Sequence, residues 1–216
     1  FARRACGASF SRAAGLSSSD SALLRRALGD FLLRGGYMAA LDLPIQDSMM
    51  LVQEYAYRTV AMDVVERYNL RAPRVAASFL TRCISSSARE LSVNKVANEF
   101  KSRGVSTSRE TLSNLLGYYE EAYLVFSLGD LSRSLADNPR SSSKVYAVDP
   151  GMFASFSRAA AREEGQRLET AVFNKLRRTA PTARSGSLAR LTFEHGGSAH
   201  EVDFIMGDAL LGDVYE

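Results

Sequence analysis

Apolar residues recur at helical spacing through most of the first 120 positions of the chain, and this pattern predicts a series of amphipathic helices. Three longer helices are expected over residues 20–34, from about 47 to 68, and from 73 onward. Gly35 and Gly36 end the first of them, because glycine tolerates the left-handed conformation of a helix cap. Pro73 begins the third, since proline fits the first helical turn. A serine-rich turn, ISSSARE, is expected to follow at 84–90.

Shorter elements follow from residue 92. We expect a helix after Ser92 that stops at Gly104, and another over 107–121, for which Thr107 and Glu110 form a capping box. Alternating apolar residues then predict strands near 124–128 and 144–149. The polar stretch between them, 129–143, can be either a wing or an insert without fixed structure. Short helices followed by a two-stranded hairpin are typical of a winged helix, in which the helix at 107–121 would be the recognition helix.

The last third of the chain predicts a helix followed by three strands. The helix is expected over 165–178, and the strand candidates are ARLTFEHG, HEVDFIM and ALLGDVYE. The fold class predicted for the whole chain is α+β. It has a helical N-terminal part, a winged helix and then a small, truncated α/β domain.

Composition limits the function classes only weakly. The 216 residues are 46% apolar, enough for a proper core, and the net charge of +3 is compatible with nucleic-acid binding without proving it. No apolar run approaches the roughly 18 residues that span a bilayer, so no membrane partner is expected. Cys6 and Cys83 make neither a disulfide framework nor a metal knuckle, which favours the cytoplasm.

The start of the chain supports two interpretations. Its first 19 residues are rich in Arg, Ala and Ser and contain no acid, a composition that mimics a mitochondrial transit segment. The alternative is a surface segment of a larger upstream domain. Because the first residue is Phe1 rather than Met, and Glu216 falls in a predicted strand, we expect a fragment of a longer protein.

Three acids are the candidate catalytic residues. Glu169 lies on a predicted helix, and Asp203 and Asp213 lie on successive strands, so a helix followed by a hairpin can bring them to one edge. Converging carboxylates would hold Mg²⁺, with Asp203 and Asp213 as metal ligands, as in restriction-endonuclease-like nucleases. Those enzymes place a lysine two residues after the second acid, where this chain has Tyr215. Lys175 lies on a different face of its helix from Glu169 and is a poor replacement for that lysine. We therefore expect the three acids to be vestigial. The alternative is that Asp203 bonds a backbone N–H or an arginine.

The predicted winged helix carries the candidate DNA-binding residues. They share a basic side chain on or beside its two short helices and are Lys95, Lys101, Arg103 and Arg109. Glu99 and Glu110 lower the net positive charge of this surface. DNA contact is therefore one interpretation, and a purely structural winged helix that packs against neighbouring domains is the alternative. The chain contains no GxxxxGK[ST] sequence and therefore has no phosphate-binding loop of that kind.

Taken in order, six stretches resemble the C-terminal part of prokaryotic AAA-type ATP-binding proteins. They are FLLRGGYMAAL, EYAYRTVAMDVVERYNLR, SVNKVANEFKSRGVSTSRETLSNLLGYYEEAYLV, KVYAVDPGM, GQRLETAVFNKLRR and HEVDFI. The positions that match the motifs of that family are Gly35, Gly36, Asp63, Arg67, Tyr68, Asp149, Gly165, Glu169, Glu201 and Asp203. Where the family has Phe-Pro-Glu after the glycines, this chain has Tyr37, Met38 and Ala39. Met62 stands in place of an arginine, and Asp213 in place of a glutamine.

The resemblance implies three parts. Residues 1–46 would end a truncated ATPase module, 47–150 would be a linking helix and winged helix, and 151–216 an incomplete restriction-endonuclease-like domain of unknown function. ATP and Mg²⁺ would bind the module upstream, so the whole protein would be an ATPase and this fragment not catalytic by itself. Nuclease chemistry is not implied, because the family commonly lacks the lysine as well.

These expectations lead to one main hypothesis and two alternatives. The main one is a regulatory region that binds double-stranded DNA or a protein partner and belongs to an ATPase, with oligomers possible. The first alternative is a Mg²⁺-dependent nuclease-like domain that is degenerate or has a relocated lysine. The second is a stand-alone winged-helix regulator.

Overall fold

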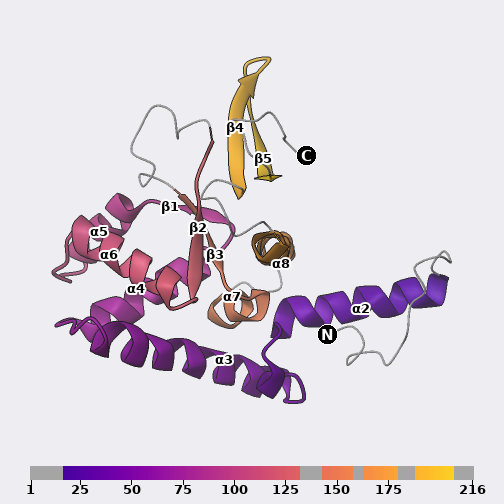
Figure 1. Cartoon of the computed structure of the whole chain (residues 1–216), viewed down its shortest axis with the longest axis horizontal. Coiled ribbons are helices and arrows are strands. Elements are labelled where there is room, and N and C mark those ends of the chain that lie inside the picture. Colours follow the sequence, from indigo (N-terminus) through magenta and orange to yellow (C-terminus); the bar gives the residue numbers. More distant parts are fainter. Residues whose placement is uncertain (1–16, 132–142, 158–162, 180–187, 207–216) are drawn as a thin grey trace.

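The computed structural model of the chain describes residues 17–131, 143–157, 163–179 and 188–206. It is an α+β structure, as predicted for the fold class: helices pack around a small antiparallel sheet, and a separate hairpin projects from this body (Figure 1). The elements from the N-terminus are α2 (Ser18–Arg34), η1 (Met38–Ala40), α3 (Ile45–Thr59), η2 (Val60–Glu66), α4 (Pro73–Ser85), β1 (Arg89–Leu91), α5 (Val93–Ser102), α6 (Arg109–Glu121), β2 (Val125–Leu128), β3 (Ser143–Ala147), α7 (Pro150–Phe156), α8 (Glu164–Thr179), β4 (Leu188–His195) and β5 (Ser198–Met206).

The first helices follow the apolar pattern closely. The Ser17 hydroxyl caps α2 by accepting a bond from the Asp20 N–H, and Gly35, at a φ of 76°, ends it as predicted. The helix expected over 47–68 begins slightly earlier and has two parts, α3 and then η2, which is a π-helix. The hydrophobic pattern could not anticipate this change, because it does not distinguish a π turn from an α turn.

A three-stranded antiparallel sheet follows, with the strand order β1-β3-β2. Arg89 pairs with Val145 on one side of β3, and Ser127 pairs with Val145 on the other. The predicted turn at 84–90 was therefore wrong at its end, since Arg89 and Glu90 belong to β1. A strand of three residues has too little alternation to be recognised, and it forms through a partner strand that is distant in the sequence.

The caps of the short helices were predicted with mixed success. Ser92 caps α5 as expected, accepting a bond from the Lys95 N–H. The capping box of Thr107 and Glu110 was wrong, because α6 begins at Arg109 and its cap is Ser108, whose hydroxyl accepts from the Thr111 N–H at 3.0 Å. Two adjacent hydroxyl residues precede the helix, and the second is the one placed to reach the backbone.

The main hydrophobic core runs from η1 to α7, so the linking helix α3 and the sheet share one interior. The Tyr119 ring of α6 is fully buried there and donates its hydroxyl proton to the Ala76 carbonyl at 2.6 Å. A second, smaller cluster contains Ala88, Leu128, Tyr146 and Phe173. Tyr146 stacks on Phe173 with ring centroids 4.0 Å apart, which joins α8 to β3.

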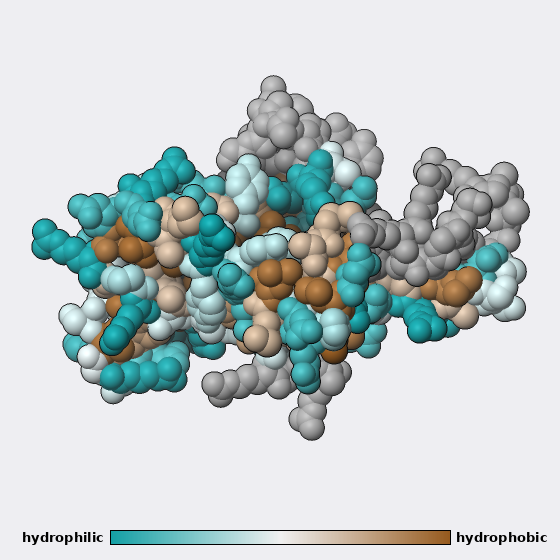
Figure 2. All heavy atoms as spheres, turned by 90° about the horizontal axis from the view of Figure 1, so that it is seen from below, coloured by the Kyte–Doolittle hydropathy of each residue, from teal (hydrophilic) through white to brown (hydrophobic). Residues whose placement is uncertain are grey.

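The C-terminal elements agree with the pattern as far as they are described. The predicted helix at 165–178 is α8, and the first two strand candidates form the antiparallel pair β4 and β5. The third candidate, 209–216, and most of the predicted loop, 132–142, lie outside the described residues. No helix in the described ranges has the length and apolarity needed to cross a membrane. From below, the surface is mostly hydrophilic with apolar patches between (Figure 2).

Candidate functional site

The predicted convergence of Glu169 and Asp203 is present, and a lysine lies between them. Lys144 Nζ is 2.8 Å from Glu169 Oε1, 2.8 Å from Asp203 Oδ1 and 3.0 Å from Glu201 Oε1. These four residues form the lysine–acid cluster. It connects β3, which belongs to the predicted winged-helix part, with α8 and β5, which both belong to the predicted C-terminal domain.

Strand and helix periodicity explain how the cluster is assembled. Lys144 and Tyr146 share one face of β3, as residues two apart on a strand do, and Tyr146 donates its hydroxyl proton to Glu169 Oε1 at 2.9 Å. Phe173 lies one helical turn after Glu169 and stacks on the Tyr146 ring. Glu201 and Asp203 are likewise two apart on β5. The aromatic stack therefore positions α8 so that the Glu169 carboxylate contacts Lys144.

A second buried cation extends the network. Arg190 on β4 is almost fully buried, and its guanidinium lies 3.3 Å from Glu201 Oε1 and 3.6 Å from Asp130 Oδ2, with a further ion pair to Glu90. Glu201 thus contacts both cations. The network holds five acids and two bases, and it attaches the β4–β5 hairpin to the three-stranded sheet.

The surroundings of Lys144 favour its charged form. Burial alone would lower the pKa of this amine, but hydrogen bonds to Asp203, Glu169 and Glu201 outweigh it and raise the pKa above its usual value. The side chain is only 8% exposed, so an ammonium here needs these partners. Lys144 is therefore a positive charge at neutral pH, held by three carboxylates.

The cluster does not fit a Mg²⁺ ion in this arrangement. The oxygens that would serve as ligands point at the Lys144 ammonium, and the described part of the chain contains no group of three or more His, Cys, Asp or Glu residues arranged to hold a metal. Asp213 lies outside the described residues, so its predicted pairing with Asp203 stays a prediction. Asp203 binds Lys144, a partner that neither sequence interpretation named.

The four predicted DNA-binding residues are all exposed. Lys95 and Lys101 lie on α5, Arg103 follows that helix, and Arg109 is the first residue of α6. The Arg103 guanidinium lies 2.7 Å from a Glu99 oxygen, so an acid offsets part of its charge. The other three form no ion pair with any residue that the structure describes, which leaves their charge available at the surface.

Another junction brings together residues that the resemblance singled out. The Gly36 N–H donates to Asp149 Oδ2 at 2.8 Å, and Asp149 Oδ1 accepts from the Gly151 N–H at 2.8 Å, capping α7. A Cβ atom on Gly35 would lie 1.7 Å from Asp149 Oδ1, and one on Gly151 would lie 2.2 Å from the Arg34 carbonyl carbon. The end of α2 and the start of α7 are therefore in backbone contact, and both need glycine.

Sequence reasoning missed Lys144, Tyr146 and Arg190 as members of the site. A signal was present, because Lys144 and Arg190 each stand in a strand among apolar neighbours, where a charged side chain requires a partner. The nuclease pattern predicts a lysine after the acids in sequence, whereas the lysine comes from the preceding strand, β3.

The fold and the cluster define an α+β protein in which two buried cations hold partly exposed acids between a helix-flanked sheet and a hairpin. The chain belongs to the family described as Domain of unknown function (DUF8612), which matches residues 25–163. It is 32% identical over 163 residues to the uncharacterized protein MJ1544 of Methanocaldococcus jannaschii, an alignment that covers 75% of this chain and 36% of that protein. The chain thus spans about a third of that relative's length. No solved structure matches the chain.

Proposed function

We propose that this chain is the DNA-contacting regulatory region of an ATP-dependent protein whose nucleotide site lies in a separate module. The observation that carries the proposal is the element order α4, β1, α5, α6, β2, β3 with the sheet order β1-β3-β2. This order resembles that of a winged helix, in which α6 would be the recognition helix. In such modules, the recognition helix enters the major groove and basic side chains beside it bind phosphates.

The distribution of charge supports contact through this module. Lys95, Lys101 and Arg109 are exposed and have no ion pair among the described residues, and Arg109 lies at the N-terminal end of α6, where the helix dipole also favours a phosphate. Glu110 and Glu121 limit the positive field of the same helix. We therefore expect moderate affinity that falls steeply with salt.

The coupling to ATP rests on the resemblance and on contacts that join the linking helix to α6. The Tyr68 ring stacks on Tyr118 of α6 with centroids 3.7 Å apart and planes 11° apart, and its hydroxyl donates to Glu121. A shift of α3 and η2 would move these contacts, and with them α6. The greater length of the relative MJ1544 is compatible with an additional module.

In this proposal, the nuclease-like acids are structural. Lys144 neutralises Glu169, Glu201 and Asp203, so the cluster joins the hairpin to the winged helix instead of binding Mg²⁺. Removal of the partners of a buried cation such as Lys144 is destabilising, which is a reason to keep the residues without catalysis.

The test is a charge reversal on the proposed contact surface. Binding of a labelled short DNA duplex is measured by fluorescence anisotropy for the unaltered chain and for Lys101→Glu with Arg109→Glu. We expect the double variant to lose at least about tenfold in affinity and to lower the slope of log K against log salt by roughly 2, one phosphate contact per residue. The matched control is Arg25→Glu with Arg26→Glu, which makes the same charge change on exposed positions of α2.

The outcomes separate the hypotheses. Equal losses in both double variants would indicate non-specific attraction, and no loss in either would remove α5 and α6 as the contact surface. Absence of DNA binding by the unaltered chain would leave a protein partner as the better interpretation of the module. The ATP part is tested independently, by nucleotide binding in the longer protein and its absence in this chain.

A further inference from the structure

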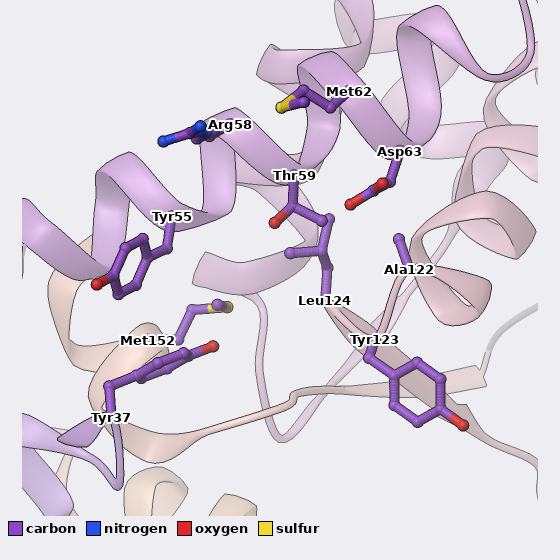
Figure 3. Close-up of a pocket in the computed structure, with 10 residues that line it drawn as sticks. All are labelled: Tyr37, Tyr55, Arg58, Thr59, Met62, Asp63, Ala122, Tyr123, Leu124 and Met152. Carbon is purple, nitrogen blue, oxygen red and sulfur yellow. The ribbon is translucent and has the colours of Figure 1, made fainter. Parts of the chain in front are cut away.

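A second candidate site shares no residue with the lysine–acid cluster. It is a cavity of about 450 Å³ between η1, α3, η2, the α6–β2 connection and α7 (Figure 3). This volume is within the range of specific ligand sites. The side chains that line it include Tyr37, Tyr55, Thr59, Asp63 and Met152.

The backbone around the cavity is unusual in two places. Asp63 lies within η2, the only π-helix in the described ranges, and π segments occur frequently at functional sites. Tyr123, in the connection from α6 to β2, has a φ of 55°, a left-handed conformation that is uncommon and unfavourable for an aromatic residue. Two uncommon conformations in different segments meet at one cavity, and such features are concentrated where function requires them.

The one acid that lines the cavity, Asp63, is an exposed residue. The Asp63 carboxylate points toward the lining side chains, whereas the Arg58 side chain extends away from it (Figure 3). Within the described residues, Asp63 has no ion pair or side-chain hydrogen bond. At the other end, the Tyr37 and Tyr55 rings lie 5.9 Å apart at an angle of 44°, and the Thr59 hydroxyl lies between these rings and Asp63.

We propose that this cavity, named here the Asp63 cavity, binds an arginine side chain of a partner polypeptide. A guanidinium pairs with a carboxylate in a bidentate manner, and the two tyrosines at the other end of the cavity give the rest of an arginine residue or its neighbour an aromatic surface to pack against. Lysine would use the carboxylate but would gain less from the rings. Neither a phosphate nor another anion fits, because Asp63 would repel it.

The rim favours a polypeptide over a free small cation. Met62 is 50% exposed and Tyr123 is 63% exposed, and both line the opening. Apolar side chains of this size at the edge of a cavity provide contact area for residues next to the inserted arginine. The Met62 thioether is also adaptable, which suits recognition of an extended segment.

The methionines of the chain allow a direct test. With ¹³C-methyl methionine labelling, the protein is titrated with N-acetyl-arginine methylamide and with the neutral citrulline analogue. We expect the signals of Met62 and Met152 to shift, while those of Met38 and Met50, exposed outside the cavity, stay in place. One side chain should bind with a dissociation constant on the order of millimolar, and citrulline at least about tenfold more weakly.

Substitutions decide whether the carboxylate is responsible. Asp63→Asn should abolish the shifts caused by arginine, and Glu66→Gln, an equal loss of charge on an exposed position of the same helix, should leave them unchanged. The proposal is overturned if citrulline binds as well as arginine, if Asp63→Asn keeps the response, or if neither methionine responds. Peptides in which arginine is flanked by leucine should bind more tightly than those flanked by serine; equal affinity would overturn the polypeptide as occupant.

Discussion

Lys144 Nζ lies 2.8 Å from Asp203 Oδ1, although the two residues belong to different sheets and are 59 positions apart in the chain. The bond crosses from the centre of the three-stranded sheet to the β4–β5 hairpin. Glu169 of α8 meets the same ammonium, so one lysine side chain fixes a helix and a hairpin against a strand. Its removal should affect the attachment of all three.

The first prediction concerns this lysine. Lys144→Met keeps the length of the side chain but leaves Glu169 without its cation, whereas the more exposed Glu201 and Asp203 can be solvated, so we expect a loss of about 2 kcal/mol in the free energy of unfolding. The measurement is urea denaturation followed by circular dichroism. Lys175→Met, an exposed position on α8, is the control and should change stability by less than about 0.5 kcal/mol. Equal effects of the two changes would contradict a structural cluster.

The second prediction concerns pH. Because the pKa of Lys144 is raised above its ordinary value of about 10.4, the native state holds this proton more tightly than the unfolded state. Its contribution to stability is therefore complete below about pH 10.4 and is lost as pH rises through the raised native pKa. The difference in unfolding free energy between the unaltered chain and Lys144→Met should be constant from neutral pH to about 9.5 and then shrink. A difference that grows above pH 10.4 would have the wrong sign.

Particular residues show how far the sequence could be interpreted. The helices were predictable because local signals agree, as at Gly35 and Pro73, where backbone chemistry and apolar spacing mark the same boundary. β1 was missed because three residues carry no period of their own and form a strand only through β3. The closeness of Glu169 and Asp203 could be predicted, and it followed from the order of helix and hairpin in the sequence. Lys144 did not, because its position depends on how β3 packs against α8, a relationship that no local pattern contains.

The third prediction tests the junction between α2 and α7. A methyl group on Gly151 would overlap the Arg34 backbone at 2.2 Å, where neither segment can move without disturbing the cap by Asp149. We expect Gly151→Ala to destabilise the protein by at least about 2 kcal/mol, through strain and loss of the bond between Gly36 and Asp149. The readout is the midpoint of urea unfolding.

Gly117 provides the matched control for that change. It lies inside α6 and nothing lies within 4 Å of an added Cβ, so Gly117→Ala should be stabilising by roughly 0.5–1 kcal/mol, the usual helix preference for alanine. The same chemical change should thus have opposite signs at the two positions. If Gly151→Ala were also neutral or stabilising, the close contact of α2 with α7 would not exist in solution.

The last prediction concerns catalysis by the nuclease-like acids. With Lys144 bonded to Glu169 and Asp203, a Mg²⁺ ion would have to displace a buried ammonium from its partners, at a cost of several kcal/mol. We therefore expect supercoiled, linear and single-stranded DNA to remain intact on incubation with the chain and Mg²⁺ or Mn²⁺, as followed by gel electrophoresis. Cleavage that is lost in Asp203→Ala but kept in Asp42→Ala, an acid on the distant connection before α3, would contradict a structural role. It would also mean that the network opens to admit the metal. Lys144 could then act beside the metal in place of the lysine that is absent after the second acid.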